Sequence, residues 1–218
     1  MTALQHQPRF LSLEGGEGAG KSTVLTALRD ALQADGVEVV CTREPGGTPL
    51  AEGIRGLLLH ANDEPVAAHT ELLMMFAARA QHVQQVILPA LQRGAWVMCD
   101  RFTDSSYAYQ GAARGMDVHF IAELERHAVG IEPGLTLLLD LDVAHARQRT
   151  RGRDLLDGAS PDRIEREHDA FFERVRAGFL ARAMQHPERI RVLDASPDAA
   201  TVAAAALVVL AEYRRGGA

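Results

Sequence analysis

The sequence predicts an α/β fold of three layers, in which a five-stranded parallel sheet is flanked by helices. Two observations support this prediction. Short apolar runs typical of buried strands alternate with longer segments whose apolar residues recur at helical spacing, a pattern characteristic of parallel sheets. A glycine-rich loop also joins the first strand to the first helix. Because there is no repeat, low-complexity block or linker, we expect residues 1–218 to form one domain with its core at about 9–214.

The first half of the chain contains three of the predicted strands. Apolar runs place them at 10–14, 37–42 and 95–100, after a polar tail at 1–8 that we expect to be loose. The first helix begins near Lys21 and ends at Gly36, and a second helix follows the Pro-Gly-Gly turn at 45–47. A long helical pattern runs from His69 to about Arg93, with Pro89 as a candidate kink.

The second half contains the other two strands, at 135–141 and 190–194. The continuous apolar character of the former predicts burial on both faces. Between the third and fourth strands we expect a loop with Ser and Tyr residues, followed by a helix at about 117–129. A basic segment, a loop at 157–161 and a long helix at about 162–185 follow the fourth strand, and an Ala-rich helix at about 198–213 closes the chain.

The composition is that of an ordinary globular protein, with 47% hydrophobic and 24% charged residues. A net charge of −6 argues against nucleic-acid or acidic-membrane partners, so an anionic ligand would be bound locally. No secretion signal opens the chain and no apolar stretch reaches membrane-spanning length, so we expect a cytoplasmic protein. Cys41 and Cys99 are expected to be buried thiols, although pairing of their strands would also allow a disulfide.

The glycine-rich loop fits the phosphate-binding pattern G-x-x-x-x-G-K-[ST], which Gly15 opens and Gly20-Lys21-Ser22 closes. Its backbone N–H groups can surround an anion at the positive end of the following helix. Lys21 would reach the β- and γ-phosphates of ATP, and the Ser22 hydroxyl would hold Mg²⁺. The alternative is a glycine-rich turn without a ligand. The residues expected at the ATP phosphates are Gly15, Gly16, Glu17, Gly18, Ala19, Gly20, Lys21, Ser22 and Thr23.

Charged residues follow the other strands, at the sheet edge where ligands of parallel α/β proteins bind. Asp100 is positioned as a carboxylate that holds Mg²⁺ through water, and Arg101 as a cation that bridges two phosphates. The alternatives are a turn cap and a surface ion pair. Arginines alternate at 147, 149, 151 and 153, and we expect them to form a lid at about 147–161 that excludes water from phosphoryl transfer. A solvated charged face is the alternative.

Phe76 and Arg79 lie one helical turn apart, so a stacking ring would sit beside a phosphate-binding fork. A Phe among Met and Ala residues is also typical of a core.

Taken together, the motifs resemble those of the thymidylate kinase family, in the same order and over about residues 9–180. They are 14–22 (Glu-Gly-Gly-Glu-Gly-Ala-Gly-Lys-Ser), 42–48 (Thr-Arg-Glu-Pro-Gly-Gly-Thr), 76–79 (Phe-Ala-Ala-Arg), 99–102 (Cys-Asp-Arg-Phe), 108–111 (Ala-Tyr-Gln-Gly) and 162–165 (Asp-Arg-Ile-Glu). The resemblance implies the P-loop NTPase fold of nucleoside monophosphate kinases. It also implies Mg²⁺-assisted transfer from ATP to dTMP, giving ADP and dTDP, by a homodimer.

The resemblance also implies roles for single residues. Those implied to contact dTMP are Glu17, Arg55, Phe76, Arg79, Arg101, Ser106, Tyr109 and Gln110. Among them, Arg55, Arg79 and Arg101 are implied at the monophosphate. Glu17 is implied near the sugar hydroxyl, Ser106 and Gln110 at the thymine edge and Tyr109 against the deoxyribose. Met75 remains an alternative to Phe76 for stacking on the base.

The phosphate loop has no basic residue at 17–19, which resembles the class whose catalytic arginine comes from the lid. Arg151 is the first choice, with Arg149 and Arg153 as alternatives, beside Lys21 and Arg101 as the other catalytic cations. A deoxynucleoside kinase and a nucleotide-dependent switch are the competing interpretations. The arginine cluster favours an acceptor that already carries phosphate, and the guanine-binding signature Asn-Lys-x-Asp does not occur in the sequence.

Overall fold

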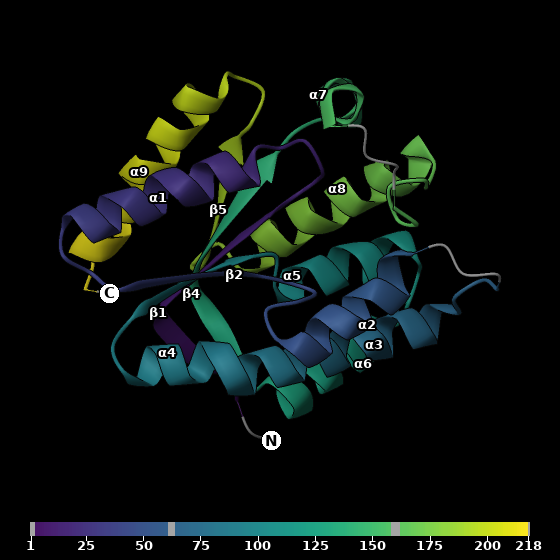
Figure 1. Ribbon diagram of the computed structural model, residues 1–218, viewed down its shortest axis with the longest axis horizontal. Helices are drawn as coiled ribbons and strands as arrows, with labels where there is room; N and C mark the ends of the chain where they lie inside the picture. The colour runs from purple at the N-terminus through teal and green to yellow at the C-terminus, as the bar shows by residue number, and fades with distance from the viewer. Residues whose placement is uncertain (1–2, 61–63, 158–161, 218) are drawn as a thin grey trace.

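The computed structural model describes residues 3–60, 64–157 and 162–217, and along 151–157 only the backbone. Within these residues, five parallel strands form one sheet in the order β2-β3-β1-β4-β5, with helices on both faces (Figure 1). The predicted three-layer α/β fold is therefore confirmed. The strands are β1 Gln5–Gly15, β2 Val39–Arg43, β3 Trp96–Asp100, β4 Ile131–Asp140 and β5 Ile190–Asp194.

The helices surround this sheet. The α-helices are α1 Lys21–Ala34, α2 Pro49–Leu59, α3 Ala68–His82, α4 Leu88–Gln92, α5 Thr103–Ser106, α6 Val118–Leu124, α7 Val143–Asp157, α8 Asp169–Gln185 and α9 Ala199–Arg215. The π-helical turns are η1 Val83–Ile87, η2 Tyr107–Ala113 and η3 Glu125–Val129. Figure 1 shows α1 and α9 side by side over one face of the sheet, with α3 and α4 on the other.

The central strands send alternate side chains into two apolar cores. Leu11 and Leu13 of β1 pack with residues of α1 and α9, whereas Phe10 packs with residues of α3, η1 and α4. In β3, Met98 joins the first core and Cys99 the second. All five side chains are fully buried. The sheet is thus covered on both faces, and the strand ends are left as the place where polar residues can meet.

The N-terminal tail was predicted to be loose, and this is wrong for residues 5–8. Gln5 pairs with Ile131 and His6 with Glu132, so that β1 and β4 both begin earlier than predicted. The side chains of Gln5 and His6 are exposed. Backbone pairing therefore holds this extension, and its polar composition does not reveal it.

The predicted loop at Ser105–Gln110 is also wrong, because this segment forms α5 and η2. The segment packs against α8. A Cβ atom on Gly178 of α8 would lie 2.7 Å from the Cβ of Ala112 and 3.0 Å from the Cα of Ala108. Small residues on both sides therefore let the two helices approach closely, and this packing overrides the weak helix propensity of Ser, Tyr and Gly.

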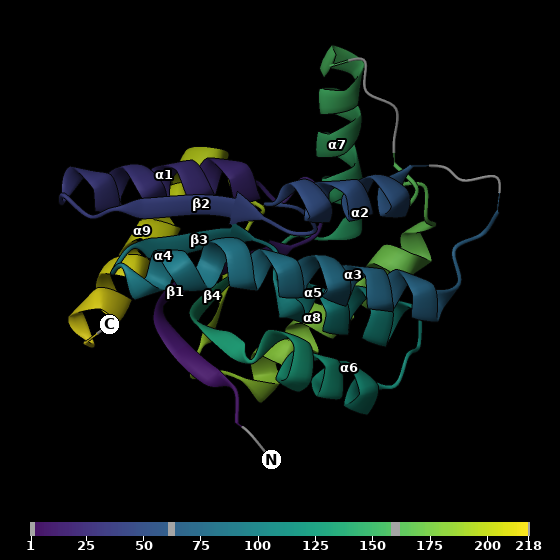
Figure 2. The same cartoon turned by 60° about the horizontal axis from the view of Figure 1, so that its bottom comes forward.

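Two other helices differ from their predicted course. α3, η1 and α4 form one continuous rod, visible in Figure 2. The N–H of Leu88 donates to the carbonyl of Val83, so a wide turn precedes Pro89, which has no N–H to donate. α8 begins at Asp169 and not at 162, because the Asp162 carboxylate accepts the N–H groups of Ile164 and Glu165 and forms a turn.

The two cysteines differ in exposure. Cys99 is buried as predicted, but Cys41 is exposed because β2 is an edge strand. Both thiols are free, and Cys41 lies opposite Met98 instead of Cys99. Among the described residues, no helix combines the length and the apolar character needed to cross a bilayer.

Candidate active site

The loop between β1 and α1 adopts a conformation that depends on its glycines. Gly15 and Gly20 have φ of +132° and +89°, values that residues with a side chain rarely adopt. A Cβ atom on Gly15 would also lie 2.4 Å from the carbonyl oxygen of Leu139 on β4. Because α1 begins at Lys21, directly after Gly20, its first N–H groups face the loop, as an anion-binding site requires.

The Lys21 side chain folds back over this loop. Its Nζ donates to the carbonyl oxygens of Gly15 at 3.3 Å and Gly16 at 2.9 Å. Burial and the nearby Arg101 guanidinium lower the pKa of Lys21 to about 8, although the carboxylates of Asp100 and Glu17 oppose this shift. The charged form of Lys21 is therefore destabilised in the absence of an anion. The negative charge of a bound phosphate would stabilise it.

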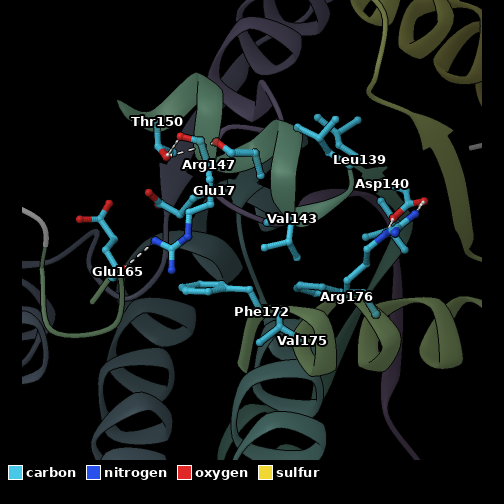
Figure 3. Close-up of a pocket in the computed structure, with 16 residues that line it drawn as sticks. Glu17, Leu139, Asp140, Val143, Arg147, Thr150, Glu165, Phe172, Val175 and Arg176 are labelled. Carbon is cyan, nitrogen blue, oxygen red and sulfur yellow. Dashed lines mark hydrogen bonds and ion pairs between the residues drawn. The ribbon is translucent and has the colours of Figure 1, made fainter. Parts of the chain in front are cut away.

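A cavity beside the loop, which we call the loop cavity, brings most of the predicted phosphate and metal residues together. The predicted residues that line it are Glu17, Gly18, Gly20, Lys21, Ser22, Thr23, Arg55, Asp100, Arg101 and Arg149. Ala19 lies instead in an adjoining hollow between α1 and α9, the α9 cavity, together with Val24, Asp198 and Val202. Gly15 and Gly16 line a third cavity under α7, the α7 cavity, shown in Figure 3.

Asp100 ends β3 and Arg101 follows it, and both line the loop cavity. Arg101 has φ +70°, which is uncommon for a residue with a side chain. Its Nη1 donates to the carbonyl of Gly15 at 3.0 Å and to Ser105 Oγ at 3.3 Å. Asp100 Oδ1 is buried without a hydrogen-bond partner among the described residues. Such an orphaned carboxylate oxygen fits a carboxylate that takes a cation or a water.

A fourth cavity, the α3 cavity, opens between α2, α3 and η2. The predicted dTMP residues that line it are Glu17, Arg55, Arg79, Arg101, Ser106, Tyr109 and Gln110. It also contains residues to which the sequence assigned no role, namely Glu44, Pro45, Asp162, Glu165 and Phe172. The first four of these belong to the motifs at 42–48 and 162–165. The sequence analysis identified these motifs but assigned no function to these residues. Phe172 had no signal beyond its place in a helical pattern.

Phe76 is not among the residues that line the α3 cavity. Its side chain is 2% exposed and packs in the core, with the guanidinium carbon of Arg79 4.8 Å above its ring. The neighbouring Met75 lines the cavity instead. One residue along a helix turns a side chain by about 100°, so the two neighbouring side chains face different ways.

Arg79 is fixed by a buried network. Its Nε donates to Glu44 Oε2 at 2.5 Å, its Nη1 to Ser106 Oγ at 3.0 Å and its Nη2 to the carbonyl of Phe102 at 3.1 Å. The other oxygen of Glu44 lies 2.9 Å from His82 Nδ1. This carboxylate therefore holds the guanidinium in one orientation at the cavity wall.

Glu17 and Glu165 form a pair of carboxyl groups between the α3 and α7 cavities (Figure 3). The hydrogen bond to Glu17, together with partial burial, raises the pKa of Glu165 to about 7. Two carboxyl groups in contact cannot both ionise without repulsion, so one proton is held between them near neutral pH.

The arginines of α7 point to different neighbours, as their alternation on a helix predicts. Arg147 donates to Asp169 at 2.9 Å and lies 4.6 Å from the centre of the Phe172 ring (Figure 3). Arg149 donates to the carbonyls of residues 195–197 at 2.9, 3.0 and 3.0 Å. The side chains of Arg151 and Arg153 lie outside the part of the chain that the structure describes.

Comparisons with known proteins agree on one family. The thymidylate kinase family profile matches residues 13–205. The chain is 55% identical over 188 residues to thymidylate kinase of Alkalilimnicola ehrlichii, covering 86% of this chain and 85% of that protein. It is 54% identical over 213 residues to the Ectopseudomonas mendocina thymidylate kinase, covering 95% and 98%.

The fold gives the same result. The crystal structure of thymidylate kinase from Ehrlichia chaffeensis superposes with a TM-score of 0.73 at 31% identity, covering 95% of this chain and 99% of that one. The family profile, the relatives and the solved structure all point to the same family. The site is consistent with it, because a phosphate loop and a second cavity adjoin at arginines. The chain therefore belongs to the thymidylate kinase family, which phosphorylates dTMP with ATP as the donor.

Proposed function

We propose that the loop cavity holds the ATP phosphates and the α3 cavity holds dTMP, so that the two phosphates meet in line at Arg55 and Arg101. One observation carries this proposal: Glu17, Glu44, Arg55 and Arg101 line both cavities. The two cavities thus adjoin at a pair of cations. Positive charge at this junction favours two anions brought together and the charge that spreads over the transferred group.

On the donor side, the backbone of residues 15–23 and the Lys21 ammonium would hold the ATP phosphates. The α9 cavity shares Gly18 and Gly20 with the loop cavity, which supports placing the adenosine end there beside Arg149. The guanidinium of Arg149 would form one wall while the 195–197 carbonyls hold it in place.

Ser22 and Asp100 would hold Mg²⁺. Both line the loop cavity, and the orphaned Asp100 Oδ1 is a group that fits a hydrated cation. When bound, Mg²⁺ would offset part of the negative charge of the phosphates. Lys21 and Arg101, which line the same cavity, would orient the phosphates.

On the acceptor side, Ser106 and Gln110 would read the thymine edge. The resemblance assigned Arg79 to the monophosphate, but we place it at the thymine edge as well, because its Nη1 donates to Ser106 Oγ at 3.0 Å. Met75, in place of Phe76, would pack on the base, and Tyr109 against the deoxyribose. Glu17 would accept a hydrogen bond from the sugar hydroxyl. The side chains of Tyr109 and Arg101 already pack together, with 5.1 Å between the guanidinium carbon and the ring centre, so the sugar and phosphate positions would be fixed by one contact.

The lid would complete the site. We place the catalytic cation at Arg151, with Arg153 as the alternative, because Arg149 is tied to the carbonyls of residues 195–197. Closure of this segment over the phosphates would exclude water and suppress ATP hydrolysis.

The protein would act as a homodimer in the cytoplasm. Exposed apolar side chains lie on neighbouring helices, Leu57 on α2, Leu73 on α3 and Phe120 on α6, and such a surface favours self-association. The two free thiols, of which Cys41 is exposed, fit a reducing compartment.

The test measures ADP formation with Mg²⁺ and a panel of acceptors: dTMP, dUMP, dCMP, dGMP, AMP, thymidine and none. We expect strong preference for dTMP and no turnover with thymidine, because the arginines at the junction require an acceptor phosphate. Arg101→Ala should reduce kcat/KM for dTMP by about 10²- to 10³-fold. Arg93→Ala, which removes an exposed arginine paired with Glu38, is the matched control and should have no effect. ATP hydrolysis at the same rate without acceptor, or an unimpaired Arg101→Ala enzyme, would contradict the proposal.

A further inference from the structure

Glu71 of α3 is a buried acid to which the proposed chemistry gives no role. Its side chain is about as buried as a core leucine, at 1% exposure. Three side chains from distant parts of the chain donate to its carboxylate. Gln110 Nε2 lies 2.9 Å from Oε1, Arg163 Nη2 lies 2.6 Å from Oε2, and Arg114 reaches both oxygens at 3.4 and 3.3 Å.

These contacts keep Glu71 ionised. Burial alone would raise the pKa of this carboxyl, but the hydrogen bonds from Gln110 and Arg163 and the charge of Arg114 outweigh burial and lower the pKa. An ionised carboxylate can only accept hydrogen bonds. Gln110 must therefore turn its NH₂ group toward Glu71, as the 2.9 Å contact of Nε2 with Oε1 shows.

This orientation determines what Gln110 offers to a ligand. With its NH₂ group engaged, the amide presents its oxygen, an acceptor, on the other side, and Gln110 lines the α3 cavity. Arg79, which lines the same cavity, can only donate, and Glu44, Ser106 and Phe102 take three of its five N–H groups among the described residues. Ser106, which Arg79 contacts, lies one helical turn from Gln110, so the wall offers an acceptor and a donor close together.

We propose that Glu71 is a specificity-determining positioning residue that makes the α3 cavity select thymine over cytosine. This proposal rests on the proposed function, in which Gln110 and Arg79 face the base edge. The hydrogen-bonding groups of the wall are complementary to those of thymine. Thymine offers N3–H as a donor and O4 as an acceptor, the match of this wall. Cytosine offers the reverse, an N3 acceptor and an amino donor, so its N3 lone pair would oppose the Gln110 oxygen.

The neutral isostere Glu71→Gln tests this directly. Arg163 and Arg114 can only donate, so the new amide must turn its oxygen toward them and its NH₂ group toward Gln110. Gln110 must then flip, and its own NH₂ group would face the cavity. We expect the ratio of kcat/KM for dTMP over dCMP to fall by about tenfold or more, with kcat/KM for dCMP rising in absolute terms. A general loss of structure would lower both values together.

Glu167→Gln is the matched control, because Glu167 also binds Arg114, at 2.6 Å, but contacts neither Gln110 nor Glu71 in the described hydrogen bonds. Its dTMP:dCMP ratio should equal that of the wild type. If Glu71→Gln fails to fold, Glu71→Asp replaces it, since a shorter carboxylate withdraws from Gln110 and frees the amide to turn.

The outcomes separate the two proposals. A wild-type enzyme without preference for dTMP over dCMP would overturn the placement of the base in the α3 cavity. A wild-type preference that persists unchanged in the folded variant at position 71 would overturn the role of Glu71 and leave the proposed function intact.

Discussion

At the scale of single residues, Lys21 connects the geometry of the phosphate loop to pH. Its pKa, lowered to about 8 by burial and by Arg101, applies to the protein without a nucleotide. Bound phosphate would favour the ammonium and raise this pKa again. Above about pH 8, ATP must therefore bind to an enzyme that is increasingly deprotonated at Lys21 and must take up a proton.

We accordingly expect ATP affinity to fall by on the order of tenfold between about pH 7.5 and 9.5. Binding titrations across this range, in buffers of different ionisation enthalpy, measure both the affinity and the proton uptake. Lys21→Arg is the control, because a guanidinium keeps its charge throughout and should remove the pH dependence even if affinity is lower. A flat wild-type profile would mean that Lys21 is already fully charged in the free protein.

Some site residues could be predicted from the sequence and others could not. Gly15 and Lys21 could be placed because a phosphate loop constrains the backbone itself, and glycine spacing records that constraint. Met75 and Phe76 could not be separated, because both are large and apolar and only the packed helix decides which one faces the cavity. The hydrogen bond from Gln110 to Glu71 joins residues that are 39 positions apart. Neither residue type indicates such a contact in the sequence.

At the scale of elements, apolar runs predicted the positions of the five strands, and helical periodicity predicted most helices. It failed where long-range packing supplied what local sequence lacked: α5 and η2 are helical because Gly178 lets α8 approach them closely. Residues 5–8 joined β1 because backbone pairing tolerates polar side chains at an exposed sheet end. In both cases the decisive partner lies far away in the chain.

The close contact between η2 and α8 gives a prediction on stability. Gly178→Ala would force a Cβ atom to 2.7 Å from that of Ala112, and such overpacking should lower the free energy of unfolding by about 1–3 kcal/mol in urea titrations. Gly53→Ala is the matched control in α2, where an added Cβ meets nothing within 4 Å. It should raise stability by roughly 0.5–1 kcal/mol. Equal changes in the free energy of unfolding at both sites would show that helix propensity, and not packing against η2, determines the effect of Gly178→Ala.

Helix α7, which begins the proposed lid, gives a prediction on kinetics. Arg151→Ala should lower kcat by about 10²-fold or more with little change in KM for dTMP, as expected for a contact made mainly in the transition state. Arg149→Ala should instead raise KM for ATP, because Arg149 lines the α9 cavity. Steady-state kinetics of the two variants distinguish these effects. If Arg153→Ala is the variant with low kcat, the catalytic position is one step further along the lid.

At the scale of the whole molecule, the exposed apolar residues of α2, α3 and α6 bear on assembly. His69 of α3 lies against Phe120 of α6, with 6.2 Å between ring centres, so the surfaces of α3 and α6 adjoin there. Leu73, 48% exposed, lies one turn further along α3.

We expect light scattering after gel filtration to give a dimer mass for the wild type and a monomer mass for Leu73→Glu, since a carboxylate buried at such an interface would be unpaired. Met184→Glu is the control, because Met184 is 77% exposed on α8, away from these helices. A dimer that survives Leu73→Glu would locate the interface elsewhere.

Both described ends of the chain lie near the side of the sheet where the parallel strands begin, opposite the four cavities named above. Parallel strands start at that side, β1 near its beginning at Gln5, and α9 runs back so that Tyr213 Oη donates to the carbonyl of Pro8 at 3.0 Å (Figure 1). A fluorescent reporter or a surface tether attached at either end would therefore stand clear of the substrate openings. Immobilised molecules should keep both openings toward solution, which makes this protein suited to single-molecule tests of the proposed lid motion.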